Sequence, residues 1–208
     1  MTEKIVINNG HDYVDLKLPS GTLWSTCNVG ANKPSDAGLY FQWADIKGYT
    51  AEQVGVTEEQ KPFTRNDYKW YPNNEEDFIK YNAKGALLEL RDDAAFFNMA
   101  GEMCWHMPSP SQIQELIDNT TNNWITLDGV NGKLFTSKKD SCKSIFIPAA
   151  GYAYAGSVQD SGIEADVWSS MLNTDVVDYG QNLSFDSDNA YLSSNSRYCG
   201  FSVRGVIG

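Results

Sequence analysis

The hydrophobic pattern at the start of the chain alternates with polar positions. From Tyr13 to Trp24, apolar and polar residues take turns on both sides of the tripeptide Pro19-Ser20-Gly21. A period of two places the apolar side chains on one face of a strand, and a Pro-Ser-Gly tripeptide favours a chain reversal. The pattern predicts a β-hairpin at the beginning of the domain.

Two helical patterns follow in the middle of the chain. From Ala86 to Ala100, apolar residues recur at three- and four-residue spacing, and Gly101 supplies a stop signal. The segment Ser109-Pro-Ser-Gln112 combines an N-cap serine, a proline at the first helical position and a capping-box glutamine. We expect a helix in each segment, the second beginning within two residues of Ser109.

The remaining segments show weaker or shorter patterns. Between about residues 44 and 85, Gly, Pro, Asn and charged residues predict an irregular excursion that aromatic residues such as Tyr68, Trp70 and Tyr71 hold to the core. Residues 144–148 are typical of a buried strand, and residues 182–203 of alternating strands broken by turns. A strand element, two helices and short strands predict an α+β fold without a parallel sheet.

Length, charge and cysteine spacing narrow the possible functions. The 208 residues suit a single domain spanning 1–208, and the net charge of −11 argues against binding to nucleic acid or anionic lipid. The chain has no apolar run that would span a bilayer, and its first residues do not resemble a signal peptide, so we expect no membrane insertion and leave the localisation open. Cys27, Cys104, Cys142 and Cys199 form no Cys-x-x-Cys pair, which predicts mostly buried thiols and no metal centre.

The last 44 residues use a narrow set of residue types. Residues 165–208 contain neither Lys nor Glu, whereas the 12 Lys and 10 Glu of the whole chain would place about four or five there. Turn-rich β segments favour Ser, Asn, Asp and Gly, which is one explanation of the bias. The alternation of apolar and polar positions suggests a second explanation, in which the polar residues form an exposed face. If Leu183 and Phe185 face the core, Asn182, Ser184 and Asp186 face outward. If Ala190 and Leu192 also face inward, Tyr191 and Ser193 face outward too.

Tyrosines among small polar residues are typical of antibody paratopes, where rigid aromatics supply contact area and small polar groups supply adaptable hydrogen bonds. Tyr179, Tyr191 and Tyr198 have such surroundings, although tyrosines that simply pack against one another would fit the sequence too. Trp168, Leu183, Phe185, Phe201 and Val203 are the expected apolar skeleton of this region. We expect Asn195 and Tyr198 at the surface with the outward residues above.

Six segments in chain order carry a resemblance to one family: His11 to Ala31, Asp92-Asp-Ala-Ala95, Trp105-His-Met-Pro-Ser109, Ser144 to Tyr152, Trp168-Ser-Ser170 and Gly200-Phe-Ser-Val-Arg204. Together they resemble the Bacteroidales and Fibrobacter major paralogous domain, in the formylglycine-generating-enzyme-like branch of the C-type lectin fold. The match departs from the family pattern at His106, where Arg is usual, and at Gly205, where Pro is usual. The resemblance implies an α+β C-type lectin-like fold with two helices.

The C-terminal half is similar to variable proteins of diversity-generating retroelements, including phage receptor-binding proteins. Such elements mutate template adenines, and a randomised AAC codon becomes NNC, which never specifies Lys, Glu, Gln, Met or Trp. The resemblance therefore implies a hypervariable ligand-binding region at about residues 165–208. Trp168, Met171 and Gln181 lie outside the NNC set and must be fixed scaffold positions under this hypothesis.

The resemblance implies a non-enzymatic receptor-binding protein whose partner is a protein or glycan on a cell surface, with several copies combined in a homo-oligomer or in a virion or surface assembly. A receptor-binding protein of this kind requires no cofactor. The ligand-binding candidates are the variable-type residues of this region: Asn173, Asp175, Asp178, Tyr179, Asn182, Ser184, Asp186, Asp188, Tyr191, Ser193, Ser194, Asn195, Ser196, Tyr198 and Cys199.

Other functions find less support in the sequence. His11 and His106 have no nearby triad partners, and Cys199 lacks the second cysteine that a formylglycine-generating oxidase would need. Asp186-Ser-Asp188 resembles the start of a calcium loop, but the twelfth position is Arg197 instead of Glu. The main alternative is a cell-surface or structural module of the same family without a diversified site.

Overall fold

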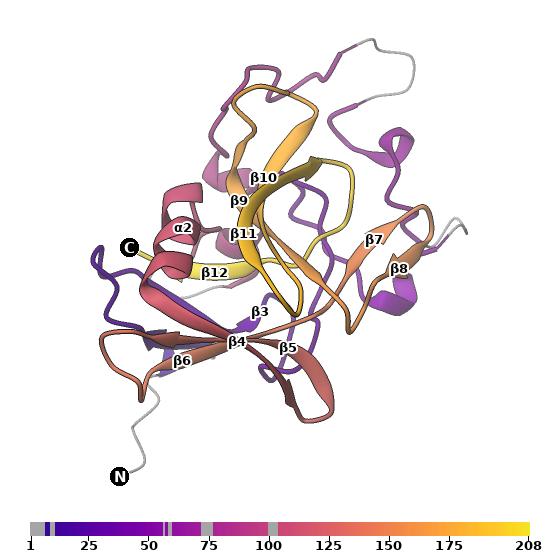
Figure 1. The fold of residues 1–208 in the computed structure, drawn as a ribbon. Helices are drawn as coiled ribbons and strands as arrows, with labels where there is room; N and C mark the ends of the chain where they lie inside the picture. The colour runs from indigo at the N-terminus through magenta and orange to yellow at the C-terminus, as the bar shows by residue number, and fades with distance from the viewer. Residues whose placement is uncertain (1–6, 9–10, 56, 58–59, 72–76, 100–103) are drawn as a thin grey trace.

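The computed structural model describes residues 7–8, 11–55, 57, 60–71, 77–99 and 104–208 (Figure 1). The strands are β1 (Ile7–Asn8), β2 (His11–Asp15), β3 (Leu23–Asn28), β4 (Thr120–Leu127), β5 (Val130–Ser137), β6 (Ser144–Pro148), β7 (Tyr152–Tyr154), β8 (Ser157–Gln159), β9 (Ala165–Leu172), β10 (Tyr179–Phe185), β11 (Ala190–Ser196) and β12 (Arg204–Ile207). The helices are α1 (Ala94–Asn98) and α2 (Pro110–Asn119), with 3-10 turns η1 (Ala51–Gln53), η2 (Arg65–Asp67) and η3 (Leu90–Asp92).

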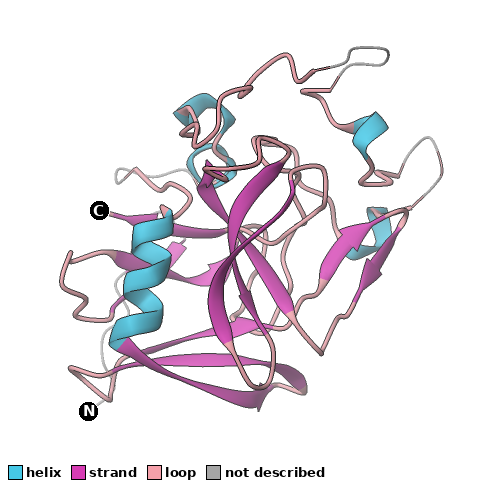
Figure 2. Ribbon diagram, turned by 45° about the horizontal axis from the view of Figure 1, so that its top comes forward, coloured by secondary structure: helices cyan, strands magenta, loops and turns pink. Residues whose placement is uncertain are grey.

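The predicted α+β C-type lectin-like fold is wrong. Strands account for 40% of the structure and helices for 13%, and the strands form four small antiparallel sheets. Figure 2 shows strands and loops throughout the molecule and α2 as its longest helix. Parallel pairing in the described part of the chain is confined to isolated bridges such as Val167 with Ser202. The fold is β-rich, since its two helices are short and most of its core comes from strands.

The predicted N-terminal hairpin is confirmed. Strand β2 pairs antiparallel with β3, and Gly21 has a positive φ of 78° in the connection. The last strand, β12, pairs with the other edge of β3, where Val206 lies opposite Trp24. The two ends of the described chain therefore share one sheet, in the order β1-β2-β3-β12.

The predicted start of α2 is also confirmed. Ser109 is the N-cap, its hydroxyl accepts a hydrogen bond from the Gln112 amide, and the Gln112 side chain accepts one from the Ser109 amide at 2.9 Å. Ile113 and Leu116 on one side of α2 are buried against strands β9, β10 and β5. The amphipathic helix thus fills the space between the C-terminal sheet and the β4-β5-β6 sheet.

The predicted helix over residues 86–100 is wrong. The segment contains η3 and the five-residue α1, while Leu87 and Phe97 are 67% and 60% exposed. Asp93 explains the break, because its carboxylate caps α1 through the Phe96 amide and also accepts from the Met107 amide. Asp93 can make these bonds only as an N-cap outside the helix. Gly101, the expected stop, lies outside the described residues.

The β11-β10-β9 sheet has two chemically different faces. Leu183, Phe185 and Val167 project toward α2 and join a buried apolar cluster. Residues one position away project to the other side, where Ser184 pairs with Tyr191 and Asp166 on its two neighbouring strands. Figure 1 shows α2 on one side of this sheet and the β7-β8 hairpin on the other. The predicted apolar skeleton is confirmed, since Trp168, Leu183, Phe185, Phe201 and Val203 are all buried.

Candidate functional site

A cavity of about 300 Å³ opens on the face of the β11-β10-β9 sheet that points away from α2. Strands β9 to β11 and the residue before β9 supply most of its wall, β7 supplies a tyrosine, and the segment before β12 supplies the rest. Its lining residues are Tyr152, Glu164, Asp166, Ser184, Tyr191, Ser193, Asn195, Cys199 and Phe201. We call it the sheet pocket.

Five of the predicted ligand-binding residues meet in the sheet pocket: Ser184, Tyr191, Ser193, Asn195 and Cys199. Tyr191 is the one aromatic residue among these five and is 49% exposed. The alternation of β10 and β11 explains the convergence, because Ser184 and Tyr191 are register partners and every second residue of β11 points the same way.

The other predicted residues lie elsewhere. Asn173, Asp175 and Asp178 occupy the turn between β9 and β10, where the Asn173 side chain accepts from the Asp175 and Val176 amides, and Tyr179 is the first residue of β10. Ser194 and Ser196 belong to the opposite face of β11, and Asp186 and Asp188 to the turn between β10 and β11. The Tyr198 ring contacts that of Tyr154, with 6.3 Å between centroids.

The predicted exposure of Asn182 is wrong. It lies on the same face as Ser184 but is fully buried, and its Nδ2 donates to Asp166 Oδ1 at 2.6 Å. Its own Oδ1 is buried without a hydrogen-bond partner among the described residues. Alternation identified the face of the strand on which Asn182 lies but not how deeply it is buried. Its register partners are Ser193 and the fully buried Trp168, and its amide bonds to the buried Asp166.

Sequence reasoning missed the acidic side of the pocket. Glu164 and Asp166 both line it, and neither takes part in an ion pair in the described part of the chain. Their spacing of two residues at the start of a strand that ends in apolar residues was an available signal, since it places both carboxylates on one face. Tyr152 and Phe201 come from segments that are distant in sequence, and no local pattern pointed to them.

Burial makes the pocket's titratable groups unusual. It raises the pKa of Asp166 to about 7, with a smaller contribution from Glu164, while the Ser184 hydroxyl and the Asn182 amide oppose the rise. Burial, together with Asp160 and Asp186, raises the pKa of Glu164. Burial and the nearby Asp166 raise the pKa of the Cys199 thiol to about 12, so Cys199 is protonated at neutral pH. The pocket holds poorly solvated acidic groups, and no Lys or Arg is among the described residues that line it.

The turn between β10 and β11 uses its polar groups internally. Asp186 Oδ1 accepts from the amides of Asp188 and Asn189, at 2.8 and 2.7 Å. The Lys133 ammonium donates to the backbone oxygens of Asp186 and Asn189. An ammonium group therefore occupies the oxygens that a calcium ion would need. Among the residues the structure describes, no three His, Cys, Asp or Glu side chains are grouped so as to hold a metal ion.

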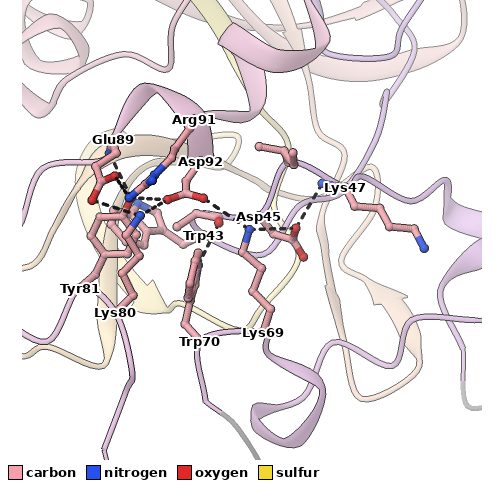
Figure 3. Close-up of polar contacts among 12 residues, drawn as sticks. Trp43, Asp45, Lys47, Lys69, Trp70, Lys80, Tyr81, Glu89, Arg91 and Asp92 are labelled. Carbon is pink, nitrogen blue, oxygen red and sulfur yellow. Dashed lines mark hydrogen bonds and ion pairs between the residues drawn. The ribbon is translucent and has the colours of Figure 1, made fainter.

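A second polar cluster joins the irregular excursion to the core (Figure 3). Asp92 accepts from Lys80 and from the Tyr81 hydroxyl, and Lys69 bridges Asp45 and Asp92. The indole of Trp70 donates to the Ala44 backbone oxygen at 3.0 Å. Since its carboxylates already have cationic partners, this cluster fixes the excursion and is a poor candidate for ligand binding.

The remaining histidine and cysteine predictions have mixed outcomes. His106 lies near the chain end, with Nε2 3.0 Å from the Gly208 oxygen and Nδ1 2.9 Å from the Met107 oxygen. The His11 side chain lies outside what the structure describes. The expectation of buried thiols is wrong for Cys104 and Cys142, which are exposed, while Cys27 and Cys199 are half-buried.

Comparison of the chain with protein-family models, with curated proteins and with solved structures found no match in any of the three. In the described part of the chain, no helix has the length and apolar character needed to cross a bilayer.

Proposed function

We propose that this protein is a receptor-binding protein that displays interchangeable side chains around the sheet pocket and binds a protein or glycan on a cell surface. One observation carries the proposal. Five of the residues predicted to be variable line a single cavity, while the residues between them on the same strands fill the core. These five side chains can therefore change with little effect on the fold.

The family resemblance stays a proposal, and the structural roles of its motif residues support it. Arg204 is fully buried and donates to Asn28 Oδ1, the Ser25 oxygen and the Phe146 oxygen, each at 3.0 Å. Three of the segments that carry the resemblance are therefore held together by one guanidinium group. These segments supply the framework, and most of the pocket lining lies outside them.

The residues that NNC codons cannot encode also have framework roles. The Gln181 side chain donates to the Leu172 backbone oxygen at 3.0 Å, and Met171 forms an isolated β-bridge with Leu87. Trp168 donates to the Phe41 oxygen. Fixed contacts at all three positions support the hypothesis that they are not diversified. Sequencing the neighbouring DNA separates this function from a module without a diversified site, since only the first requires a reverse transcriptase gene and a template repeat.

A thiol-dependent oxidase finds no support in the pocket. Cys199 is its only cysteine, and the raised pKa of that thiol disfavours the thiolate that such chemistry needs. Copper binding with thiol-dependent turnover would favour the oxidase and contradict our proposal.

Two exposed tyrosines on one sheet provide a matched test. Tyr191 lines the sheet pocket, and Tyr179, which is 39% exposed, does not. We expect Tyr191→Ala to weaken binding at least about tenfold, because aromatic residues in an interface commonly carry much of its energy. Tyr179→Ala should change affinity less than about twofold, and both variants should stay within about 0.5 kcal/mol of wild-type stability.

The measurement is binding of labelled protein to a panel of bacterial cells, immobilised surface proteins and printed glycans, with thermal unfolding in parallel. Binding that survives Tyr191→Ala on every target would contradict the proposed site. Unfolding of Tyr191→Ala would show that the tyrosine belongs to the core.

A further inference from the structure

We propose that the sheet pocket binds an organic ammonium group, such as the end of a lysine side chain on a protein target. This inference rests on the proposed function and specifies the chemistry of its ligand. It follows from the charge, the aromatic side chains and the hydrogen-bond acceptors that line the pocket.

The charge around the pocket is negative and uncompensated. Glu164 and Asp166 line it, and no Lys or Arg does. The charged groups that act on Glu164 are the acidic Asp160 and Asp186, and the one that acts on Asp166 is Glu164. The nearby Lys133 ammonium donates to two backbone oxygens of the β10-β11 turn. A buried carboxylate without a cationic partner is costly, and a bound cation would offset that cost.

The aromatic residues suit a cation as well. Tyr152, Tyr191 and Phe201 border the same cavity as the two carboxylates. The face of an aromatic ring attracts an ammonium group within about 6 Å, and the attraction strengthens when water is excluded. A cavity of about 300 Å³ is at the small end of ligand sites, which suits the end of one side chain.

The polar groups of the pocket are rich in acceptors. The hydroxyls of Ser184 and Ser193 line it, and Asn182 lies beneath them on the same strand face. Asn182 does not line the pocket, but its Oδ1 is buried beneath this face without a hydrogen-bond partner among the described residues, so it adds negative potential under the site. An ammonium group is a pure donor with three N–H bonds, so it complements this set better than a carboxylate or phosphate would.

Protonation of Asp166 gives the site a pH dependence. The groups that face it or act on its surroundings are Glu164, Asp160, Asp186, Tyr152, Tyr191 and Cys199. With the pKa of Asp166 raised to about 7, about one tenth of the carboxyl groups are ionised at pH 6 and about nine tenths at pH 8. Ammonium affinity should therefore rise up to about tenfold between these pH values.

The same carboxylate opposes folding. Its pKa in the folded state lies above the ordinary value of 3.8, so ionisation lowers the stability of the fold as the pH rises from about 4 to about 7. Asp166→Asn removes this cost and keeps an acceptor for the Asn182 amide. We expect its melting temperature at pH 8 to equal or exceed that of the wild type. A residue that lowers stability while facing a cavity fits a binding role.

The experiment titrates the full chain with Nα-acetyl-lysine methylamide and with its neutral Nε-acetyl analogue, and measures affinity by NMR at pH 6 and pH 8. At pH 8 we expect the charged probe to bind at least about tenfold more tightly than the neutral one. Asp166→Asn should lower the affinity about tenfold and abolish the pH dependence. The matched control Asp188→Asn, in the exposed turn outside the pocket, should leave both unchanged.

Equal binding of the two probes, or an unchanged affinity in Asp166→Asn, would overturn the inference. Displacement of the amine by calcium at equal concentration would also overturn it, because it would identify a metal site. Failure of this inference can be distinguished from failure of the proposed function. If Tyr191→Ala abolishes binding to a surface target that carries no amine, the receptor-binding role stands and only the ammonium specificity is contradicted.

Discussion

Replacing Trp168 with alanine is expected to lower the free energy of unfolding by about 3–5 kcal/mol. Trp168 is fully buried, and its ring stacks on Phe201 with 4.0 Å between centroids and 24° between planes. Its indole donates to the Phe41 backbone oxygen at 2.7 Å. Truncation would leave a large cavity between the C-terminal strands and the segment around Phe41 and would remove a buried hydrogen bond, although the Phe41 oxygen keeps the Phe201 amide as a donor.

Urea unfolding monitored by circular dichroism measures this effect. Trp70 is a matched control, since its indole also donates to a backbone oxygen but its side chain is only partly buried in the excursion. Trp70→Ala should cost distinctly less than Trp168→Ala. Equal costs would show that the packing under the sheet pocket does not carry the stability assigned to it.

Replacing Arg197 with methionine is expected to cost about 3–5 kcal/mol, because it breaks a buried network and leaves several acceptors unpaired. Arg197 is fully buried. Its guanidinium donates to the Tyr68 hydroxyl at 2.8 Å and to the backbone oxygens of Tyr81 and Lys80. It also lies 4.2 Å from the centre of the Phe78 ring. A single side chain between β11 and β12 thus anchors the excursion.

The control for this substitution is Arg91→Met. The Arg91 side chain is 75% exposed and pairs with Glu89, so its loss should cost less than about 1 kcal/mol. Limited proteolysis adds a second readout, since cleavage within residues 60–85 should accelerate in Arg197→Met and not in Arg91→Met. An Arg197→Met variant with wild-type stability and cleavage would contradict this anchoring role.

Local signals predicted local structure well. The capping box at Ser109 and the Pro-Ser-Gly connection each specify a hydrogen-bonding pattern within a few residues, and both elements formed where expected. The helix over residues 86–100 failed because apolar spacing says nothing about partners elsewhere, and Asp93 bonds to the distant Met107 amide. Tertiary contacts therefore determined the secondary structure of residues 86–100.

The fold class was harder to predict because several strands are polar. Thr120–Leu127 carries four Thr or Asn residues in its first four positions and still forms one of the longest strands. Its hairpin partner begins after Asp128-Gly129, where φ values of 51° and 82° fit the two left-handed positions of a tight turn. That Asp-Gly pair was the available signal for a hairpin, and taking it into account would have shifted the balance from helix to strand.

The candidate site was only partly predictable for a geometric reason. Alternation along β10 and β11 identified Ser184, Tyr191 and Ser193 as neighbours on one face, because register partners are set within a hairpin. The acidic wall comes from β9 and the segment before it, and Tyr152 comes from another sheet. Their approach depends on how the sheets pack, which no local pattern encodes.

A pair of display libraries tests the central claim most directly. One randomises Ser184, Tyr191, Ser193 and Asn195 with NNC codons, and the other randomises Ala190, Leu192, Leu183 and Phe185 on the opposite face of the same strands. The measurement is the fraction of displayed variants that resist protease, followed by selection on the panel of surface targets. We predict that most pocket-face variants stay resistant and yield binders to several targets, while most opposite-face variants are cleaved. Equal cleavage of the two libraries, or a resistant pocket-face library without binders to any target, would contradict the account.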